Sequence, residues 1–397
     1  MKLHYFILAI LVLMAGACGS HPAGPSALEA WEKMGPSSEP SEEPSEDPSE
    51  DIIVDPSTED PSAEDPSEEP ELTPESRWFQ TRGVIVGWND IAYKYPNSVD
   101  YLRLAREHHL NAISTGGMDK NLSVWKEFVK EATQAGVKFE TQQHAMGVLL
   151  PRNLFDEHPE YFRMDKQGNR LKDVNGCPSS EGALEEIARN AKVLGAENNP
   201  TNHRYYFWMD DGGDVCYCDK CKGLSPADQA LMFENRIIVA LKEIDPDATL
   251  AHLAYNNTTN APTKVKPAED IFLEFAPIHR SYSHPLSETW AEGNGGWTHA
   301  KYLKALQENL KVFPAETALV LEYWIDDSLF SGWKRDKLVA VPWNKELFLD
   351  DLKTYAKYGI RHITSFCVYV GPDYVKKFGY PTFMEEYADG LWEFEKQ

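Results

Sequence analysis

The feature that most constrains the fold of this 397-residue chain is a repeated alternation of apolar and amphipathic segments from Trp78 onward. Eight apolar segments have the length of strands: residues 83–88, 111–115, 137–142, 204–209, 249–255, 271–275, 318–323 and 362–368. Amphipathic segments typical of helices lie between several of them, at residues 99–108, 123–132, 230–244, 301–310 and 345–358. This alternation predicts a (β/α)8 TIM barrel over residues 78–397 rather than a doubly wound sheet. No Gly-x-Gly-x-x-Gly follows the first segment, which argues against a dinucleotide-binding fold.

The first residues are typical of an export signal. Lys2 is followed by the apolar run 6–14 and by the small residues Ala15-Gly16-Ala17-Cys18. These last four residues resemble a bacterial lipoprotein signal, so we expect residues 1–18 to be the signal peptide and Cys18 to carry the lipid. The apolar run is too short for an ordinary transmembrane helix. The pattern therefore predicts an exported protein, anchored by lipid to the cell envelope at the outer membrane, on its periplasmic or its outer face.

Residues 19–77 are expected to form a disordered acidic tether. Between Ser37 and Ser76 nearly every residue is Pro, Ser, Glu or Asp, a composition that buries too little apolar surface to form a core. This stretch holds 16 of the 63 acidic residues and none of the 39 Lys and Arg, so the net charge of −24 falls to −8 without it. The remaining sequence has no basic stripe, which argues against binding to nucleic acid.

The fourth apolar segment ends in two adjacent carboxylates. Tyr205 to Met209 reads as a buried strand, and Asp210 and Asp211 follow it directly. Residues at the carboxyl ends of barrel strands line the active sites of TIM-barrel enzymes. Neighbouring carboxylates repel each other, and this cost is commonly offset by acid/base chemistry or cation binding. The alternative is that both residues only cap the following loop.

Other segments also end in polar or aromatic groups that are expected to converge on the same end of the barrel. Glu322 is one of them, and it is flanked by aromatic residues. The remaining candidates for contact with a ligand are Trp88, Asn89, His144, Tyr255, Glu274, Tyr323 and Trp324. Aromatic rings cover the apolar faces of sugars, and carboxylates handle hydroxyls and the glycosidic oxygen. The combination therefore predicts a carbohydrate site.

The cysteines form a separate motif. Cys216, Cys218 and Cys221 are closely spaced, and Cys177 lies upstream. Four thiols suit a structural zinc site, whereas in an exported protein they also suit disulfides. Either arrangement would hold the loop after the fourth strand beside Asp211. We expect Cys367 to be a buried free thiol.

Several short motifs, taken in order, resemble the barrel family known as domain of unknown function 4838. They are His158-Pro159-Glu160-Tyr161-Phe162, Gly168-Asn169-Arg170, Cys177-Pro178-Ser179-Ser180, Asp211 with the cysteine motif, Phe233-Glu234-Asn235 and Leu253-Ala254-Tyr255. The resemblance covers roughly residues 80–395. It implies a glycoside-hydrolase-like TIM barrel, distantly similar to α-glucuronidases and β-hexosaminidases. In those hydrolases a carboxylate at the end of the fourth strand is the general acid, a place that Asp211 or Asp210 matches. The Asp-Glu pair of hexosaminidases is absent.

Two functions follow as hypotheses. The first is a glycoside hydrolase that uses Asp211, with Asp210 beside it, as the acid and Glu322 as the base or nucleophile, with no cofactor for the chemistry. The second is a non-catalytic barrel that binds glycans on the cell surface through the same aromatic rim. A purely structural lipoprotein is a third possibility, and it would need no such rim.

Overall fold

The structure is a computed structural model, and it describes residues 77–87, 90–91, 98–116 and 123–396. The predicted signal peptide with Cys18, the predicted tether up to residue 76, and the rim candidates Trp88 and Asn89 lie outside the described residues. Within the described ranges, no helix is long and apolar enough to cross a membrane.

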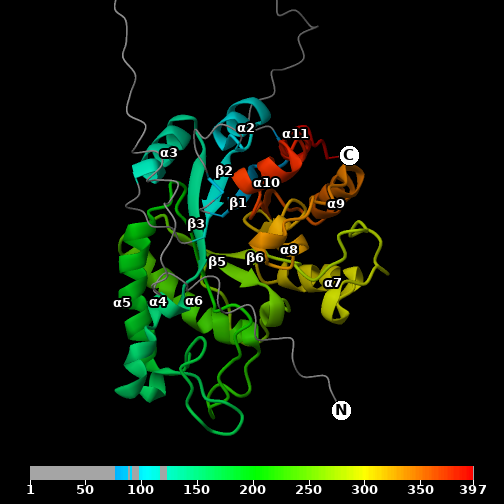
Figure 1. Cartoon of the computed structure of the whole chain (residues 1–397). Coiled ribbons are helices and arrows are strands. Elements are labelled where there is room, and N and C mark those ends of the chain that lie inside the picture. Colours follow the sequence, from blue (N-terminus) through cyan, green and yellow to red (C-terminus); the bar gives the residue numbers. More distant parts are fainter. Residues whose placement is uncertain (1–76, 88–89, 92–97, 117–122, 397) are drawn as a thin grey trace, which may run out of the picture. The chain divides into compact units, whose positions relative to one another are not determined.

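Eight parallel strands close into a barrel in the order β1 to β8, which confirms the predicted (β/α)8 fold (Figure 1). The strands are β1 (Thr81–Val86), β2 (Ala112–Thr115), β3 (Lys138–His144), β4 (Arg204–Trp208), β5 (Thr249–Ala254), β6 (Ile271–Phe275), β7 (Leu319–Glu322) and β8 (His362–Phe366). All eight overlap the segments expected from the sequence. Most of them are short runs rich in apolar and aromatic residues, which are typical of strands in a parallel sheet.

Helices surround the barrel (Figure 1). The α-helices are α2 (Tyr101–His108), α3 (Ser123–Gln134), α4 (Met146–Leu149), α5 (Glu181–Asn198), α6 (Pro226–Lys242), α7 (His299–Asn309), α8 (Asp327–Phe330), α9 (Lys345–Lys357), α10 (Pro372–Phe378) and α11 (Phe383–Trp392). Five of them match the expected amphipathic segments. The long helix α5 between β3 and β4 was not expected, since Gly182 and Gly195 lie within it and glycine disfavours helix interiors.

The strands divide their side chains between two hydrophobic layers. The layer inside the barrel includes Ile85, Tyr206, Phe272, Leu321 and Tyr323. The layer between strands and helices takes the alternate residues, such as Val320 of β7 and Trp324 just after this strand. Successive residues of a strand point to opposite faces, so the parity of each position decides whether a side chain reaches the interior.

The barrel closes where the first strand meets the last. Residues 81–85 of β1 pair in register with residues 362–366 of β8. The hydroxyl of Tyr387 in α11 donates a hydrogen bond of 2.7 Å to the carbonyl of Gly83 in β1. The C-terminal helix α11, red in Figure 1, accordingly packs beside the blue-cyan helix α2 near the start of the described chain.

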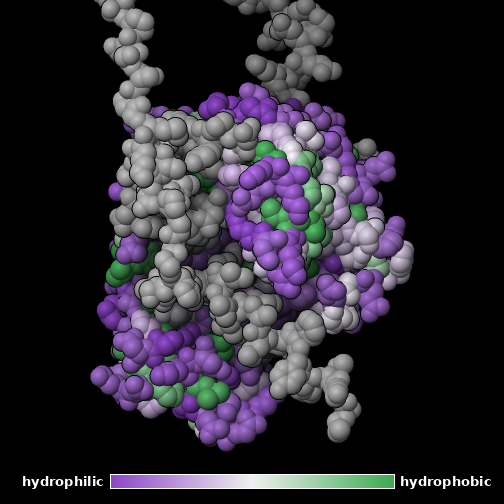
Figure 2. Space-filling model, in the orientation of Figure 1, coloured by the Kyte–Doolittle hydropathy of each residue, from purple (hydrophilic) through white to green (hydrophobic). Residues whose placement is uncertain are grey.

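Figure 2 shows that hydrophilic residues cover most of the described surface on the face in view, with hydrophobic residues in scattered patches. This is the pattern expected of amphipathic helices that turn their apolar sides toward a barrel.

Candidate functional site

Asp211 lies at the carboxyl end of β4, in contact with residues that follow β5. The Asn256 amide nitrogen is 3.4 Å from the Asp211 carboxylate, and Tyr255, the residue before Asn256, lies close to the same carboxylate. Burial, followed by the Asp211 charge, raises the pKa of Tyr255 well above its usual range, so Tyr255 stays protonated as a donor. Asp211, Tyr255 and Asn256 are all half-buried. Solvent therefore reaches the Asp211 carboxylate after β4, and this carboxylate accepts a hydrogen bond from Asn256.

His279, which follows β6, adds a residue from a third strand end to the contacts of Asp211, Tyr255 and Asn256. Its Nε2 lies 2.7 Å from the Asn256 side-chain oxygen, so Asn256 accepts from His279 while it donates to Asp211. Burial lowers the pKa of His279, although the Asp211 carboxylate opposes the shift. The imidazole is therefore neutral near neutral pH, and its proton lies on the nitrogen that faces Asn256. Asp211, Tyr255, Asn256 and His279 are called the Asp211 group below.

Asp210 has a different role from its neighbour. Its carboxylate forms an ion pair with Arg152 and accepts the backbone N–H of Asn175. The Asp210 backbone N–H in turn donates to the Asn175 side-chain oxygen over 2.8 Å. Asp210, which the sequence suggested as a catalytic residue, thus anchors its loop to the segment before α5.

A small crevice lies beside the Asp211 group. It has a volume of about 40 Å³, and its lining includes His144, Asp210, Tyr255 and Asn256. By the volume that one water-sized probe occupies, this is room for about three water molecules. His144 is half-buried there, with its Nδ1 hydrogen-bonded to the Met209 carbonyl oxygen.

Aromatic side chains surround the open end of the barrel. Tyr255, Tyr282, Trp333 and Phe366 are partly buried and pack on the interior layer. Tyr323, an expected ligand contact, is only 3 % exposed and stacks on Phe366 with ring centroids 5.0 Å apart. The sequence did not point to Tyr282, Trp333 or Phe366. Trp333 and Tyr282 lie in loops without periodicity, and the mixed sequence of β8 does not reveal that Phe366 faces inward.

Backbone geometry at this end of the barrel is also unusual. Asn256, Trp333 and Tyr369 have φ angles of 49°, 62° and 70°. Bulky aromatic residues rarely adopt this left-handed conformation, and such strain concentrates at functional sites. The Tyr369 hydroxyl donates to the Trp333 carbonyl over 3.4 Å, which links the two strained aromatic residues.

Glu274 faces the barrel interior but lies below the mouth. It is fully buried, and the Trp208 indole N–H donates to it over 2.6 Å. Burial raises the pKa of Glu274 to about 8, although the Trp208 hydrogen bond opposes the shift. Among the described residues no partner reaches its second oxygen. The sequence predicted that Glu274 contacts a ligand. In the structure it accepts the Trp208 hydrogen bond inside the barrel, and its raised pKa keeps it neutral near neutral pH.

The expectation that Glu322 and Trp324 face the site is wrong. Glu322 lies on the outer face of β7 and Trp324, two residues beyond the strand, packs in the same outer layer; Glu322 is 0 % and Trp324 4 % exposed. The Arg280 guanidinium is 3.1 Å from the Glu322 carboxylate, and the Tyr355 hydroxyl of α9 donates to the same group. Trp324 donates over 2.8 Å to Asp351, also in α9. The physical reason is strand parity, because Leu321 and Tyr323 take the inward positions.

Two other carboxylates at this end fasten loops to one another. Asp326 caps α8 and accepts the backbone N–H of Val368 over 3.1 Å. Asp90 is fully buried, forms an ion pair with Arg335 and accepts the N–H of Tyr369 over 2.8 Å. The loops after β1, β7 and β8 are therefore joined around the mouth.

The structure brings the four clustered cysteines together. The sulfur atoms of Cys177, Cys216, Cys218 and Cys221 all lie within 4.8 Å of one another, and all four are buried free thiols. Cys367 is also a buried free thiol, directly after β8, as the sequence predicted.

Fold and site together define a (β/α)8-barrel protein whose polar and aromatic groups gather at the carboxyl ends of the strands. Residues 77–329 match the model of the family described as Domain of unknown function (DUF4838), and the chain belongs to this family. No curated protein matches the sequence.

Several solved structures are similar. The β-N-acetylhexosaminidase from Bacteroides fragilis NCTC 9343 is 11 % identical with a TM-score of 0.48, over 80 % of this chain and 67 % of that one. A glycoside hydrolase family 5 enzyme from Prevotella bryantii B14 is 12 % identical with a TM-score of 0.42, over 79 % and 97 % of the chains. At this level of identity and overlap, the likenesses assign no activity to this chain.

Proposed function

We propose that this protein is a glycoside hydrolase in which Asp211 exchanges protons as the general acid/base. The observation that carries the proposal is the position of Asp211. It is a half-buried carboxylate just after β4, hydrogen-bonded to Asn256 and close to Tyr255, at a barrel mouth surrounded by aromatic rings. The rings supply stacking surface for a sugar, and the carboxyl supplies the proton transfer that cleavage of a glycosidic bond requires.

The other members of the Asp211 group orient the Asp211 carboxyl, and only Asp211 is proposed to exchange a proton. Asn256 donates to Asp211, Tyr255 lies close to the same carboxylate, and His279 fixes the orientation of the Asn256 amide. A carboxyl that is held in one orientation loses little freedom when a substrate oxygen arrives, which favours proton transfer. Glu322 takes no part, since it is committed to Arg280 behind β7.

A second candidate function is glycan binding without catalysis. The observation that favours it is the engagement of two of the three expected catalytic carboxylates in ion pairs, Asp210 with Arg152 and Glu322 with Arg280. A binding protein needs the aromatic mouth and Asp211 as a hydrogen-bond acceptor, and it needs no second acid.

The test is a screen of the purified protein against aryl glycosides and against plant and host polysaccharides, followed by Asp211→Asn. On a substrate that the wild type cleaves, we expect this variant to lose roughly 10²-fold in kcat, the usual scale for a general acid/base. Asp336→Asn, an exposed aspartate after α8, is the matched control and should keep full activity.

Full activity of Asp211→Asn on a cleaved substrate would overturn the assignment. Binding of glycans that weakens with Asp211→Asn, without cleavage of any substrate in the screen, would favour the second function.

We further propose that the protein is exported and anchored to the cell envelope through a lipid on Cys18, with residues 19–77 as an acidic tether. The motif Ala15-Gly16-Ala17-Cys18 supports the anchor and the Pro/Ser/Glu/Asp composition supports the tether. Metabolic labelling with a fatty acid should mark the wild type and not Cys18→Ser. Equal labelling of both would contradict the anchor.

A further inference from the structure

The four clustered cysteines have the geometry of a tetrahedral metal site. The Cys177 sulfur lies 3.5 Å from the Cys216 sulfur and 3.8 Å from the Cys218 sulfur. Tetrahedral zinc with Zn–S bonds of about 2.3 Å separates its ligand sulfurs by about 3.8 Å. A disulfide needs about 2.05 Å between two sulfurs. The cluster therefore surrounds a common centre and does not divide into two close pairs.

The ligands come from two segments that the cluster would join. Cys177 lies just before α5, whereas Cys216, Cys218 and Cys221 lie in the loop between β4 and α6. All four are buried, at 0 to 8 % exposure. Four buried thiols leave no open coordination position, and this is the arrangement of structural rather than catalytic zinc sites.

Polar groups around the sulfurs match the surroundings of a metal thiolate. The Met164 backbone N–H donates to the Cys216 sulfur over 3.3 Å. The Ser179 hydroxyl lies 3.3 Å from the Cys177 sulfur and 3.4 Å from the Cys218 sulfur. The Arg170 side chain lies beside Cys177. Donors to the ligand atoms and a nearby positive charge offset the net negative charge of four thiolates around a divalent ion.

We propose that Cys177, Cys216, Cys218 and Cys221 bind one Zn²⁺ ion that fastens the loop after β4 to the segment before α5. Soft thiolate ligands in a tetrahedral arrangement select zinc over hard cations such as Mg²⁺ and Ca²⁺. The ion has a structural role, and its position explains why two segments so distant in the chain meet here.

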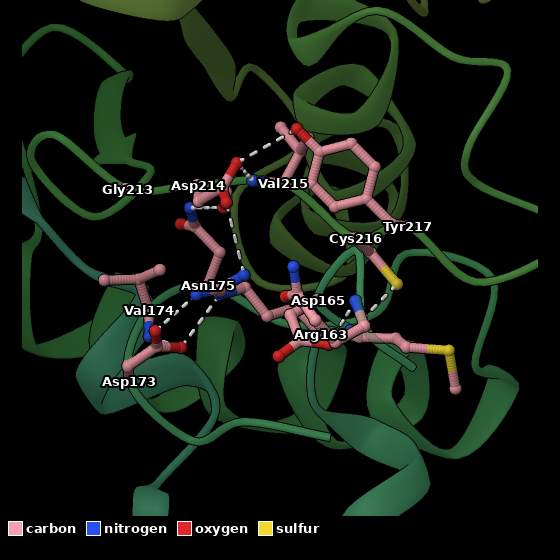
Figure 3. Close-up of polar contacts among 12 residues, drawn as sticks. Arg163, Asp165, Asp173, Val174, Asn175, Gly213, Asp214, Val215, Cys216 and Tyr217 are labelled. Carbon is pink, nitrogen blue, oxygen red and sulfur yellow. Dashed lines mark hydrogen bonds and ion pairs between the residues drawn. The ribbon is translucent and has the colours of Figure 1, made fainter. Parts of the chain in front are cut away.

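The same two segments carry the contacts that hold Asp210. Asn175, two residues before Cys177, receives and donates the hydrogen bonds that fix Asp210. Its amide also donates to the Asp214 carbonyl over 3.3 Å, and Arg163 contacts the Asp214 carboxylate over 3.4 Å (Figure 3). The Gln229 side chain of α6 accepts the Cys216 backbone N–H and donates to the Cys216 carbonyl. The ion would thus stabilise the loop that presents Asp211.

The test begins with the metal content of the full chain, purified without chelator. We expect about one zinc per chain, and four thiols that become reactive only when a chelator is added. Cobalt exchanged into the protein should give the visible absorption of tetrahedral Co²⁺ with thiolate ligands, a readout independent of any enzymatic activity. Removal of the metal should lower the Tm on the order of 10 °C.

Cys218→Ser is the variant and Cys367→Ser the matched control, because Cys367 is equally buried but lies outside the cluster. We expect Cys218→Ser to lose zinc stoichiometry and the cobalt absorption, and Cys367→Ser to keep both. If Cys218→Ser does not fold, the measurements on the wild type still decide. Protein without metal, whether its four cysteines are in disulfides by mass spectrometry or freely titratable, would overturn the proposal.

Discussion

Arg280 shows how a residue can shape the barrel mouth without contacting a ligand. Its guanidinium is fully buried between Glu322 of β7 and Asp351 of α9. Tyr355 donates to Glu322 and Trp324 donates to Asp351, so the ion pairs are hydrogen-bonded on both sides. Charges buried in this way are tolerated only while every partner is present, because an unpaired buried charge costs several kcal/mol. Since Arg280 directly follows His279, these pairs also fix one end of the Asp211 group.

We therefore expect Glu322→Gln to act on stability. The substitution leaves Arg280 with one fewer negative partner, which should lower the free energy of unfolding on the order of 3 kcal/mol. Urea denaturation measures the change, and Glu316→Gln, an exposed glutamate just before β7, is the control. Unchanged stability together with lost activity would instead return Glu322 to a catalytic role.

At the scale of elements, the connection between β6 and α7 depends on one close backbone approach. A Cβ placed on Gly293 would lie 1.9 Å from the His279 carbonyl oxygen and 2.6 Å from the Arg280 carbonyl carbon. Asn294 also donates its N–H to His279 over 2.7 Å. The end of the connection thus supports its beginning, where His279 reaches Asn256.

Gly293→Ala should displace the His279–Arg280 segment, because backbone atoms cannot move aside as a side chain does. We expect a loss of roughly 1–3 kcal/mol, typical of overpacking, measured as a lower Tm. Gly147→Ala is the control, since a Cβ in α4 meets nothing within 4 Å and should leave the Tm unchanged or slightly higher. An equal Tm for both variants would show that the connection is not tightly packed.

The eight strands and five of the helices were predictable from the sequence, whereas α5 and the directions of the side chains were not. Apolar and aromatic runs located most of the strands, because a parallel barrel buries both faces of its strands. Because both faces are buried, the sequence does not show which residues of a strand face the barrel interior. β7 reads Leu-Val-Leu-Glu, and all four residues are buried. Nothing in that pattern says that Leu321 faces inward and Glu322 outward. Asp211 and Tyr255 were found because they follow strand ends, whereas Trp333 and Tyr282 lie in loops whose course no periodicity predicts.

At the scale of the whole molecule, buried acids make stability depend on pH. Burial raises the pKa of Glu274 from 4.5 to about 8, and burial raises the pKa of Asp326 from 3.8 to about 7. As the pH rises between the unfolded and folded values, the unfolded chain releases protons that the folded barrel retains. Stability therefore falls with rising pH across this window, by up to about 1.4 kcal/mol per pH unit for each group.

We expect the wild type to lose stability between about pH 5 and pH 8, and Glu274→Gln to lose less over the same range, since Gln keeps an acceptor for Trp208 without a titrating group. Urea denaturation at several pH values gives the two slopes. Glu157→Gln, an exposed glutamate, should retain the wild-type slope. Identical slopes for wild type and Glu274→Gln would mean that Glu274 titrates normally.

The closure of the barrel between β1 and β8 has a consequence for synthesis of the chain. One edge of β1 at residues 81–85 pairs with residues 362–366, which are synthesised about 280 residues later. At 5–20 residues per second, a ribosome takes roughly 15–55 s to make the intervening chain. During that interval an apolar strand with an open edge is present, and such edges promote aggregation. We therefore expect chaperones that bind nascent chains to raise the yield of this protein mainly by shielding the open edge of β1.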